Sequence, residues 1–155
     1  MKLSQNIAPA VSGLLAGVSA SAQQLPAGVV MVNAATAPQS QWISSPSGQI
    51  LNVSGDLSKP GPYVFLLKVN KGQIAPSAAH THPEDRTYTV ISGTWYVGFG
   101  TKFDESKLIA LPPGSYYTEP AGVPHFVMAK DDAVVVQISG TTGPTRQDFV
   151  EPPKK

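Results

Sequence analysis

The sequence predicts an all-β, antiparallel fold of the barrel or sandwich type, with at most one short helical turn. Proline (15 residues) and glycine (14 residues) recur at short intervals, and runs rich in β-branched and aromatic residues lie between them. Short strands separated by turn signals are typical of sandwiches and barrels. After Gln23 no long stretch keeps the apolar period of an amphipathic helix, so we expect strands to form the whole core.

Seven runs are predicted to form strands, because each combines β-favouring residues with turn residues at both ends. In chain order they are 49–53, 63–69, 86–91, 94–99, 116–118, 126–128 and 133–138. One helical turn is expected over 103–108, where Asp104 is placed to cap the first backbone N–H groups.

The chain is long enough for one domain, preceded by a segment of different composition. Lys2 and a small, apolar stretch precede Ala20-Ser21-Ala22, an A-x-A cleavage pattern. Residues 1–22 are therefore predicted to be a secretory signal peptide, the alternative being an unstructured tail. The rest divides into a segment that wraps the barrel or adds an edge strand, the barrel itself and a surface tail, over 23–47, 48–140 and 141–155.

Charge and cysteine content exclude several classes of protein. The net charge is +1 and both signs are dispersed, so we expect no nucleic-acid surface and, after signal cleavage, no membrane surface. The chain has no cysteine, which excludes cysteine catalysis and leaves only nitrogen and oxygen ligands for a metal. With the signal peptide, these features predict a periplasmic or secreted protein.

All three histidines of the chain lie in one region of regularly spaced glycines. His80 and His82 are two positions apart, so on a strand their side chains point to the same face. A third ligand, His125, can come from a distant strand. Because histidine is the commonest metal ligand, we predict that these three bind one metal ion, and the alternative for each is a purely structural imidazole.

These motifs resemble those of the cupin superfamily, in particular its small, single-domain, exported bacterial members of the type-2-like, metal-binding kind. The first family motif corresponds to Gly72, His80, His82 and Gly93. The second corresponds to Gly114, Pro120, Gly122 and His125, with Ala129 where the family has asparagine. The resemblance covers roughly residues 50–140. It implies a cupin-type antiparallel jelly-roll barrel that holds one divalent transition metal (Fe, Zn, Mn, Ni or Cu) in its mouth.

The acidic ligand of the first motif falls at position 86, which is an arginine here. A guanidinium stays protonated and has no lone pair for a metal. We favour an open three-histidine site in which Arg86 attracts a substrate carboxylate or enolate. Two alternatives remain: Glu84 replaces the missing ligand, or Arg86 pairs with Glu84, Asp85 or Glu119 and the site is structural or metal-free.

Strand alternation adds further candidates for the pocket. Tyr88 shares the parity of Arg86, so these two residues are the candidate catalytic side chains. Gln137 lies in an apolar run and either supports a ligand or faces outward. All three histidines are assigned to the metal, so no Ser-His-Asp arrangement is expected.

The resemblance leaves several functions open, because cupins include dioxygenases, isomerases, lyases and non-catalytic binders. We expect a metal-dependent enzyme with dioxygenase-like, lyase or isomerase chemistry on a small anionic or oxygenated substrate. The alternatives are a module that binds a small ligand or metal without turnover, and a structural cupin that has lost its metal. The family's habit of pairing edge strands also makes a homodimer one expectation.

Overall fold

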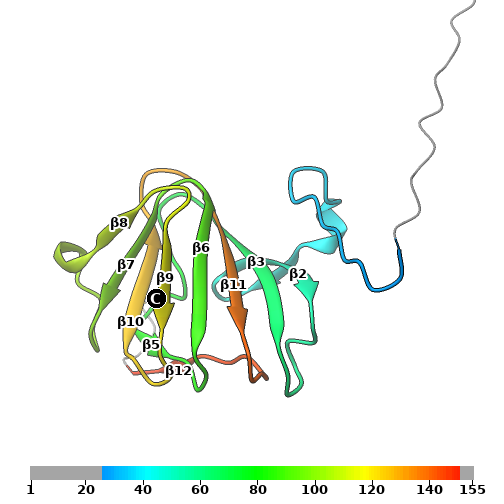
Figure 1. Cartoon of the computed structure of the whole chain (residues 1–155). Coiled ribbons are helices and arrows are strands. Elements are labelled where there is room, and N and C mark those ends of the chain that lie inside the picture. Colours follow the sequence, from blue (N-terminus) through cyan, green and yellow to red (C-terminus); the bar gives the residue numbers. More distant parts are fainter. Residues whose placement is uncertain (1–25, 151–155) are drawn as a thin grey trace, which may run out of the picture.

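Two antiparallel β-sheets face each other in this protein, whose computed structural model describes residues 26–150 (Figure 1). The predicted signal peptide, residues 1–22, lies outside the described residues. The predicted fold class is confirmed: strands form both layers, and the helical elements among the described residues are two 3₁₀ turns. In the same part of the chain, no helix combines the length and apolarity that a membrane span needs.

The first sheet has six strands, with β11 near its centre between β3 and β6. In spatial order its strands are β1 (Ile43–Ser45), β2 (Gly48–Ser54), β3 (Tyr63–Val69), β11 (Val134–Gly140), β6 (Arg86–Ser92) and β9 (Tyr116–Glu119). Along β11 buried and half-buried residues alternate, so Val136 and Ile138 face the core while Gln137 lies on the outer face. Of the two alternatives for Gln137, support of a ligand or an outward position, the structure shows the outward position.

The second sheet carries two of the three histidine-bearing segments. Its strands are β12 (Asp148–Phe149), β5 (His80–Thr81), β10 (His125–Ala129), β7 (Trp95–Phe99) and β8 (Ile109–Leu111), with β4 (Gln73–Ile74) paired to β10. The 3₁₀ turns are η1 (Gln39–Gln41) and η2 (Glu105–Lys107). At η2 the Asp104 side chain accepts a hydrogen bond from the Ser106 backbone N–H, which confirms the predicted helical turn and its cap.

The core fills the space between the sheets. Its largest fully buried side chains include Trp95 and Tyr63. Gly93 forms the turn between β6 and β7 with φ of 71°, and a Cβ there would lie 2.3 Å from the Ala133 carbonyl oxygen. A glycine is therefore required for the tight turn that sets the register of these two strands.

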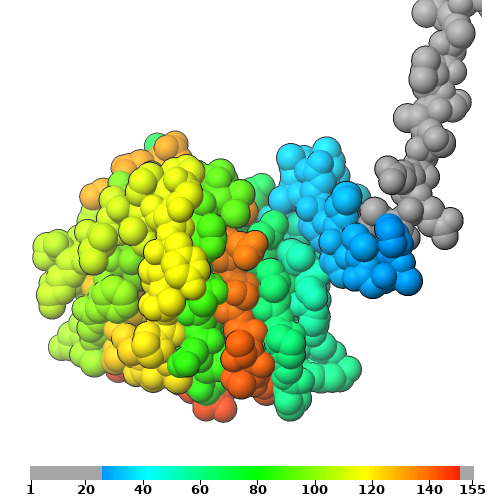
Figure 2. Space-filling model, in the orientation of Figure 1, coloured from blue at the N-terminus to red at the C-terminus, as the bar shows by residue number. Residues whose placement is uncertain are grey.

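The segment that precedes β1 lies mostly exposed beside the β2 end of the first sheet (Figure 2). Its strand β1 pairs antiparallel with β2 and forms the edge of that sheet. At the other end of the chain, β12 pairs with β5, so Phe149 lies opposite His80. The last described residues thus lie directly beside the first histidine.

Candidate metal centre

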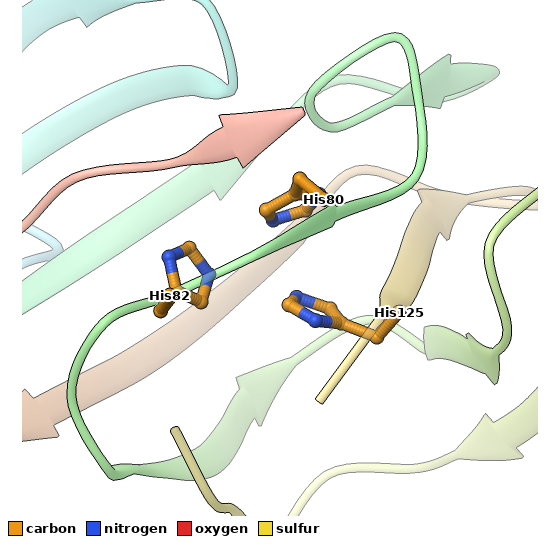
Figure 3. A group of neighbouring side chains, drawn as sticks. All are labelled: His80, His82 and His125. Atoms are coloured by element: carbon orange, nitrogen blue, oxygen red, sulfur yellow. The ribbon is translucent and has the colours of Figure 1, made fainter. Parts of the chain in front are cut away.

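The three histidines converge between the two sheets, and their rings point toward one another (Figure 3). His80 lies on β5 and His125 on β10, and the two residues are direct cross-strand partners. His82 comes directly after β5, two residues beyond His80. One ligand atom from each ring lies within 4.8 Å of the others, and each side chain is at most 3% exposed. The structure therefore brings together the three residues whose spacing predicts a shared metal.

Each imidazole is oriented by a hydrogen bond from its Nδ1 to a backbone carbonyl. The pairs are His80 with Ala78 at 3.2 Å, His82 with Arg146 at 2.7 Å and His125 with Val123 at 3.1 Å. A carbonyl oxygen only accepts, so the proton of each neutral ring is on Nδ1. Nε2 is then the nitrogen with a lone pair. Histidines that bind a metal through one ring nitrogen usually donate the proton of the other nitrogen to a carbonyl or carboxylate, as these Nδ1 atoms do.

Burial keeps all three rings neutral at physiological pH. Burial is the main cause that lowers the pKa of His80 to about 3, of His82 to about 2 and of His125 to about 4. The nearby Arg86 charge acts in the same direction on each of them. Neutral imidazole is the form that binds a metal, so protons compete little for this site.

The donor set fits a divalent transition metal. Ligand atoms about 2.1 Å from one ion lie about 3.0–3.4 Å apart when adjacent and about 4.2 Å apart when opposite. The observed spread of up to 4.8 Å means that the most distant pair must approach by about 1.4–1.8 Å to take adjacent positions on one ion. Neutral nitrogen ligands suit Zn, Fe, Cu and Ni.

Arg86 is buried beside this group and already has several partners. Its Nε and Nη2 donate to Glu84 Oε1 at 3.0 and 2.7 Å, and Nη2 also contacts Thr145. Its Nη1 lies 3.0 Å from His82 Nε2, so the guanidinium donates to the lone pair that a metal would use. Metal binding through His82 therefore requires the loss of this hydrogen bond.

Glu84 does not join the histidine group. Its Oε1 accepts from Arg86 and, at 2.7 Å, from the Tyr63 hydroxyl, and in the described part of the chain the carboxylate contacts of the histidines are made by Glu119 rather than Glu84. The Arg86–Glu84 pair considered under the metal-free alternative is thus present, together with the converging imidazoles.

A second buried carboxylate, Glu119 on β9, lies against two of the histidines. Its Oε2 is 3.2 Å from His125 Nε2 and its Oε1 is 3.7 Å from His82 Nε2. Burial raises the pKa of Glu119 to about 8. From the sequence, Glu119 is expected only as one possible partner of Arg86. Its position beside the histidines depends on the pairing of β6 with β9, which the sequence does not reveal.

Tyr88 faces the same interior as Arg86, as strand alternation predicts. Its ring stacks on Tyr117 with centroids 4.4 Å apart, and its hydroxyl donates to Glu119 Oε1 at 3.1 Å. Burial raises the pKa of Tyr88 well above its usual value, so the phenol stays protonated and remains a hydrogen-bond donor. Its catalytic role stays a prediction.

A cavity of about 180 Å³ opens beside the histidines. Arg86 and Tyr88 line its polar end, together with the three imidazoles. The apolar walls include Ile50, Phe65, Leu67, Trp95, Val127 and Ile138. An apolar cavity of roughly 150 Å³ holds a benzene ring, so this volume matches a small molecule of single-ring size.

Comparison with known proteins supports the fold. No family model matches the sequence. The chain is 33% identical over 66 residues to germin-like protein 8-1 of Oryza sativa subsp. japonica, a match that covers 41% of this chain and 30% of the rice protein. The matched region thus spans less than a third of the length of that relative.

Solved structures share the same architecture at low sequence identity. A conserved Klebsiella pneumoniae protein with a double-stranded β-helix domain has a TM-score of 0.54 at 20% identity, over 74% of this chain and 94% of that one. An RmlC-like cupin from Shewanella frigidimarina has a TM-score of 0.51 at 12% identity, over 64% and 79%. Salicylate 1,2-dioxygenase from Pseudoaminobacter salicylatoxidans has 0.54 at 14%, over 70% and 30%. The chain therefore has the double-stranded β-helix fold of the cupins, with three buried histidines that can bind a metal.

Proposed function

We propose that this protein is a metal-dependent cupin enzyme that binds one divalent transition metal through His80, His82 and His125. The observation that carries the proposal is the set of three buried, neutral imidazoles, each with its Nδ1 proton held by a backbone carbonyl. Such an arrangement leaves three Nε2 atoms in one small volume. It is the preorganisation that a metal site needs.

The cavity suggests the class of substrate. Bound at the histidines, a divalent metal supplies Lewis acidity and, where it is redox-active, oxygen activation. The apolar walls exclude water and accept a small, ring-sized body, while the polar end meets an oxygenated or anionic group. Arg86, whose charge is paired with Glu84, presents guanidinium N–H donors at that end, and Tyr88 holds a proton near it. We therefore propose a small anionic or oxygenated substrate.

A specific contact favours a second candidate, a binding protein without turnover. Arg86 donates to His82 and is itself paired with Glu84, so one of the three imidazoles has a protein partner without any metal. In this case the cavity takes up a small ligand and the histidines stay a hydrogen-bonded cluster.

Metal titration tests the proposed metal site. Protein stripped with a chelator is offered Fe(II), Zn(II), Mn(II), Ni(II) or Cu(II), and bound metal is measured by calorimetry and elemental analysis. We expect one equivalent in the native chain and at least a hundredfold loss of affinity in His80→Ala. Gln137→Ala, on the outer face of β11, is the control and keeps full binding. Substoichiometric weak binding, unchanged in His80→Ala, contradicts the proposal.

Oxygen uptake by the iron-loaded protein tests the reaction class. A panel of small diketones, phenols and hydroxy acids is offered, with consumption of each compound followed in parallel. Oxygen uptake that accompanies formation of product from a panel compound indicates dioxygenase-like chemistry. Conversion of a compound without oxygen uptake indicates a lyase or isomerase. Binding of panel members with no conversion favours the binding protein instead.

We also propose that the protein is exported and works in the periplasm or outside the cell. The support is the sequence pattern at the start of the chain, with its A-x-A site before Gln23. Cell fractionation and N-terminal sequencing of the mature protein test this. A mature chain that begins at Gln23 in the exported fraction supports it, and an intact Met1 in the cytoplasm contradicts it.

A further inference from the structure

We propose that Glu119 is the acidic ligand of the metal centre and that it replaces the carboxylate which the resemblance places at position 86. This inference rests on the proposed function, since it presupposes a metal at the histidines. It moves the fourth ligand from β6 to the neighbouring strand β9.

The first support is distance. Glu119 Oε2 lies 3.2 Å from His125 Nε2, inside the separation of about 3.0–3.4 Å expected for adjacent ligands on one ion. The other oxygen lies 3.7 Å from His82 Nε2, so the carboxylate touches two of the three imidazoles. Both imidazole atoms bear lone pairs rather than protons, so without a cation or a proton between them these contacts are not favourable.

The second support is an unsatisfied atom. Glu119 is 2% exposed, and its Oε2, like that of Glu84, has no hydrogen-bond partner among the described residues, but of these two oxygens it is the Glu119 one that lies against a histidine nitrogen. A buried carboxylate oxygen without a partner is costly, and a cation beside it removes the cost. Its other oxygen, Oε1, accepts from the Tyr88 hydroxyl, which fixes the direction in which the free oxygen points.

The third support is the distribution of charge across β6 and β9. Arg86 and Glu119 are direct cross-strand partners, so the two buried residues occupy neighbouring positions on the first sheet. Arg86 forms its ion pair with Glu84 at 2.7 Å, and none is formed with Glu119 in the described part of the chain. Glu119 is thus the buried carboxyl group left to face the histidines, and a cation bound there would favour its ionised form.

Tyr88 then acts as a positioning residue. Its hydroxyl holds Glu119 Oε1, and its ring is fixed by stacking on Tyr117. A monodentate carboxylate ligand that is held on its second oxygen is the usual arrangement in metal sites.

Cobalt(II) binding separates this inference from the three-histidine proposal. Affinity and the visible d–d absorption spectrum are measured for the native chain, for Glu119→Gln and Glu84→Gln, which each lose one buried carboxylate, and for Glu105→Gln. We expect Glu119→Gln to lower the affinity at least tenfold and to change the spectrum, because an anionic oxygen ligand is lost. Glu105→Gln, which removes an exposed carboxylate outside the cavity lining, is the control and keeps the native affinity and spectrum. Circular dichroism verifies that each variant is folded.

Other outcomes overturn the inference in distinguishable ways. If Glu119→Gln binds with native affinity and spectrum while His80→Ala does not bind, the metal has only histidine ligands and the proposed function stands. If Glu84→Gln alone loses the metal, Glu84 is the ligand. If the native chain binds no cobalt, both proposals fail. Should Glu119→Gln not fold, Glu119→Asp keeps the charge on a shorter side chain, and an unchanged spectrum in that variant contradicts ligation.

Discussion

At the scale of single residues, the ion pair between Arg86 and Glu84 decides how much charge the site contains. Both side chains are buried, with 4% and 3% exposed. Removing one partner leaves the other charge buried and unpaired, so Arg86→Met and Glu84→Gln are each expected to lower the free energy of unfolding by about 3–5 kcal/mol. The double variant Arg86→Met, Glu84→Gln is expected to recover much of this loss. Denaturant unfolding of the four proteins measures the coupling.

That cycle has a clear contrary result. If the change in the free energy of unfolding of the double variant equals the sum of the changes in the two single variants, the residues are not coupled. The pair then does not neutralise the charge of Arg86. Arg86 would then be free to act on a substrate anion as an unpaired cation. The same proteins, loaded with metal and tested for ligand binding, report whether Arg86 contacts the substrate.

The histidines and Glu119 differ in how far the sequence could predict them. His80 and His82 share a face by local spacing, and the resemblance of the residues around His125 to the second cupin motif implies that it is the third ligand. Glu119 has no such local signal. Its place beside His125 follows from the β6–β9 register, which pairs it with Arg86, and from the convergence of two sheets. Non-local pairing of this kind cannot be read from one sequence.

At the scale of elements, the pairing of β7 with β10 positions His125. Gly98 lies opposite Phe126, and a Cβ on Gly98 would lie 2.3 Å from the Phe126 ring. Phe126 is fully buried and packs against Phe103, so its ring cannot move away without disturbing that contact. Gly98→Ala is therefore expected to destabilise the protein by about 1–3 kcal/mol and to weaken metal binding through the neighbouring His125.

Thermal unfolding and metal titration of this variant test the prediction. Thr101→Ala, at an exposed position after β7, is the control and is expected to change neither measurement. A Gly98→Ala protein with native melting temperature and native metal affinity would show that β10 tolerates the added methyl group.

The elements also show which parts of the fold the sequence could predict. Runs such as Tyr63–Val69 carry enough β-branched and aromatic residues to define a strand on their own, and β3 has these bounds. The short strands β4, β5 and β12 have only two residues each. They are strands only because β10 or β5 lies alongside, and so their own composition could not predict them.

At the scale of the whole molecule, the buried histidines link stability to pH. In the metal-free protein their pKa values lie near 3, 2 and 4, against 6.5 when unfolded. The unfolded chain therefore binds more protons below pH 6.5, and the stability present above that pH is lost as the pH falls. Glu119 acts oppositely, because its pKa is raised to about 8 and folding favours its protonated form. Because three imidazoles release protons on folding and one carboxyl takes one up, the net effect is that stability falls as the pH falls.

We expect the free energy of unfolding of the metal-free protein to fall by about 2–3 kcal/mol per pH unit between pH 6 and pH 5, since each net proton contributes about 1.4 kcal/mol. Urea unfolding at several pH values after chelation measures this slope. A stability that stays flat over this range would show that the imidazoles are already protonated or solvated in the folded state.

The most direct test of the metal centre is a crystal structure of the metal-loaded protein with anomalous data at the absorption edge of the metal. We expect one ion about 2.0–2.2 Å from Nε2 of His80, His82 and His125, with a Glu119 oxygen as a further ligand and the Nδ1–carbonyl hydrogen bonds intact. An ion bound elsewhere, or histidines that bind through Nδ1 after losing those hydrogen bonds, would contradict this expectation.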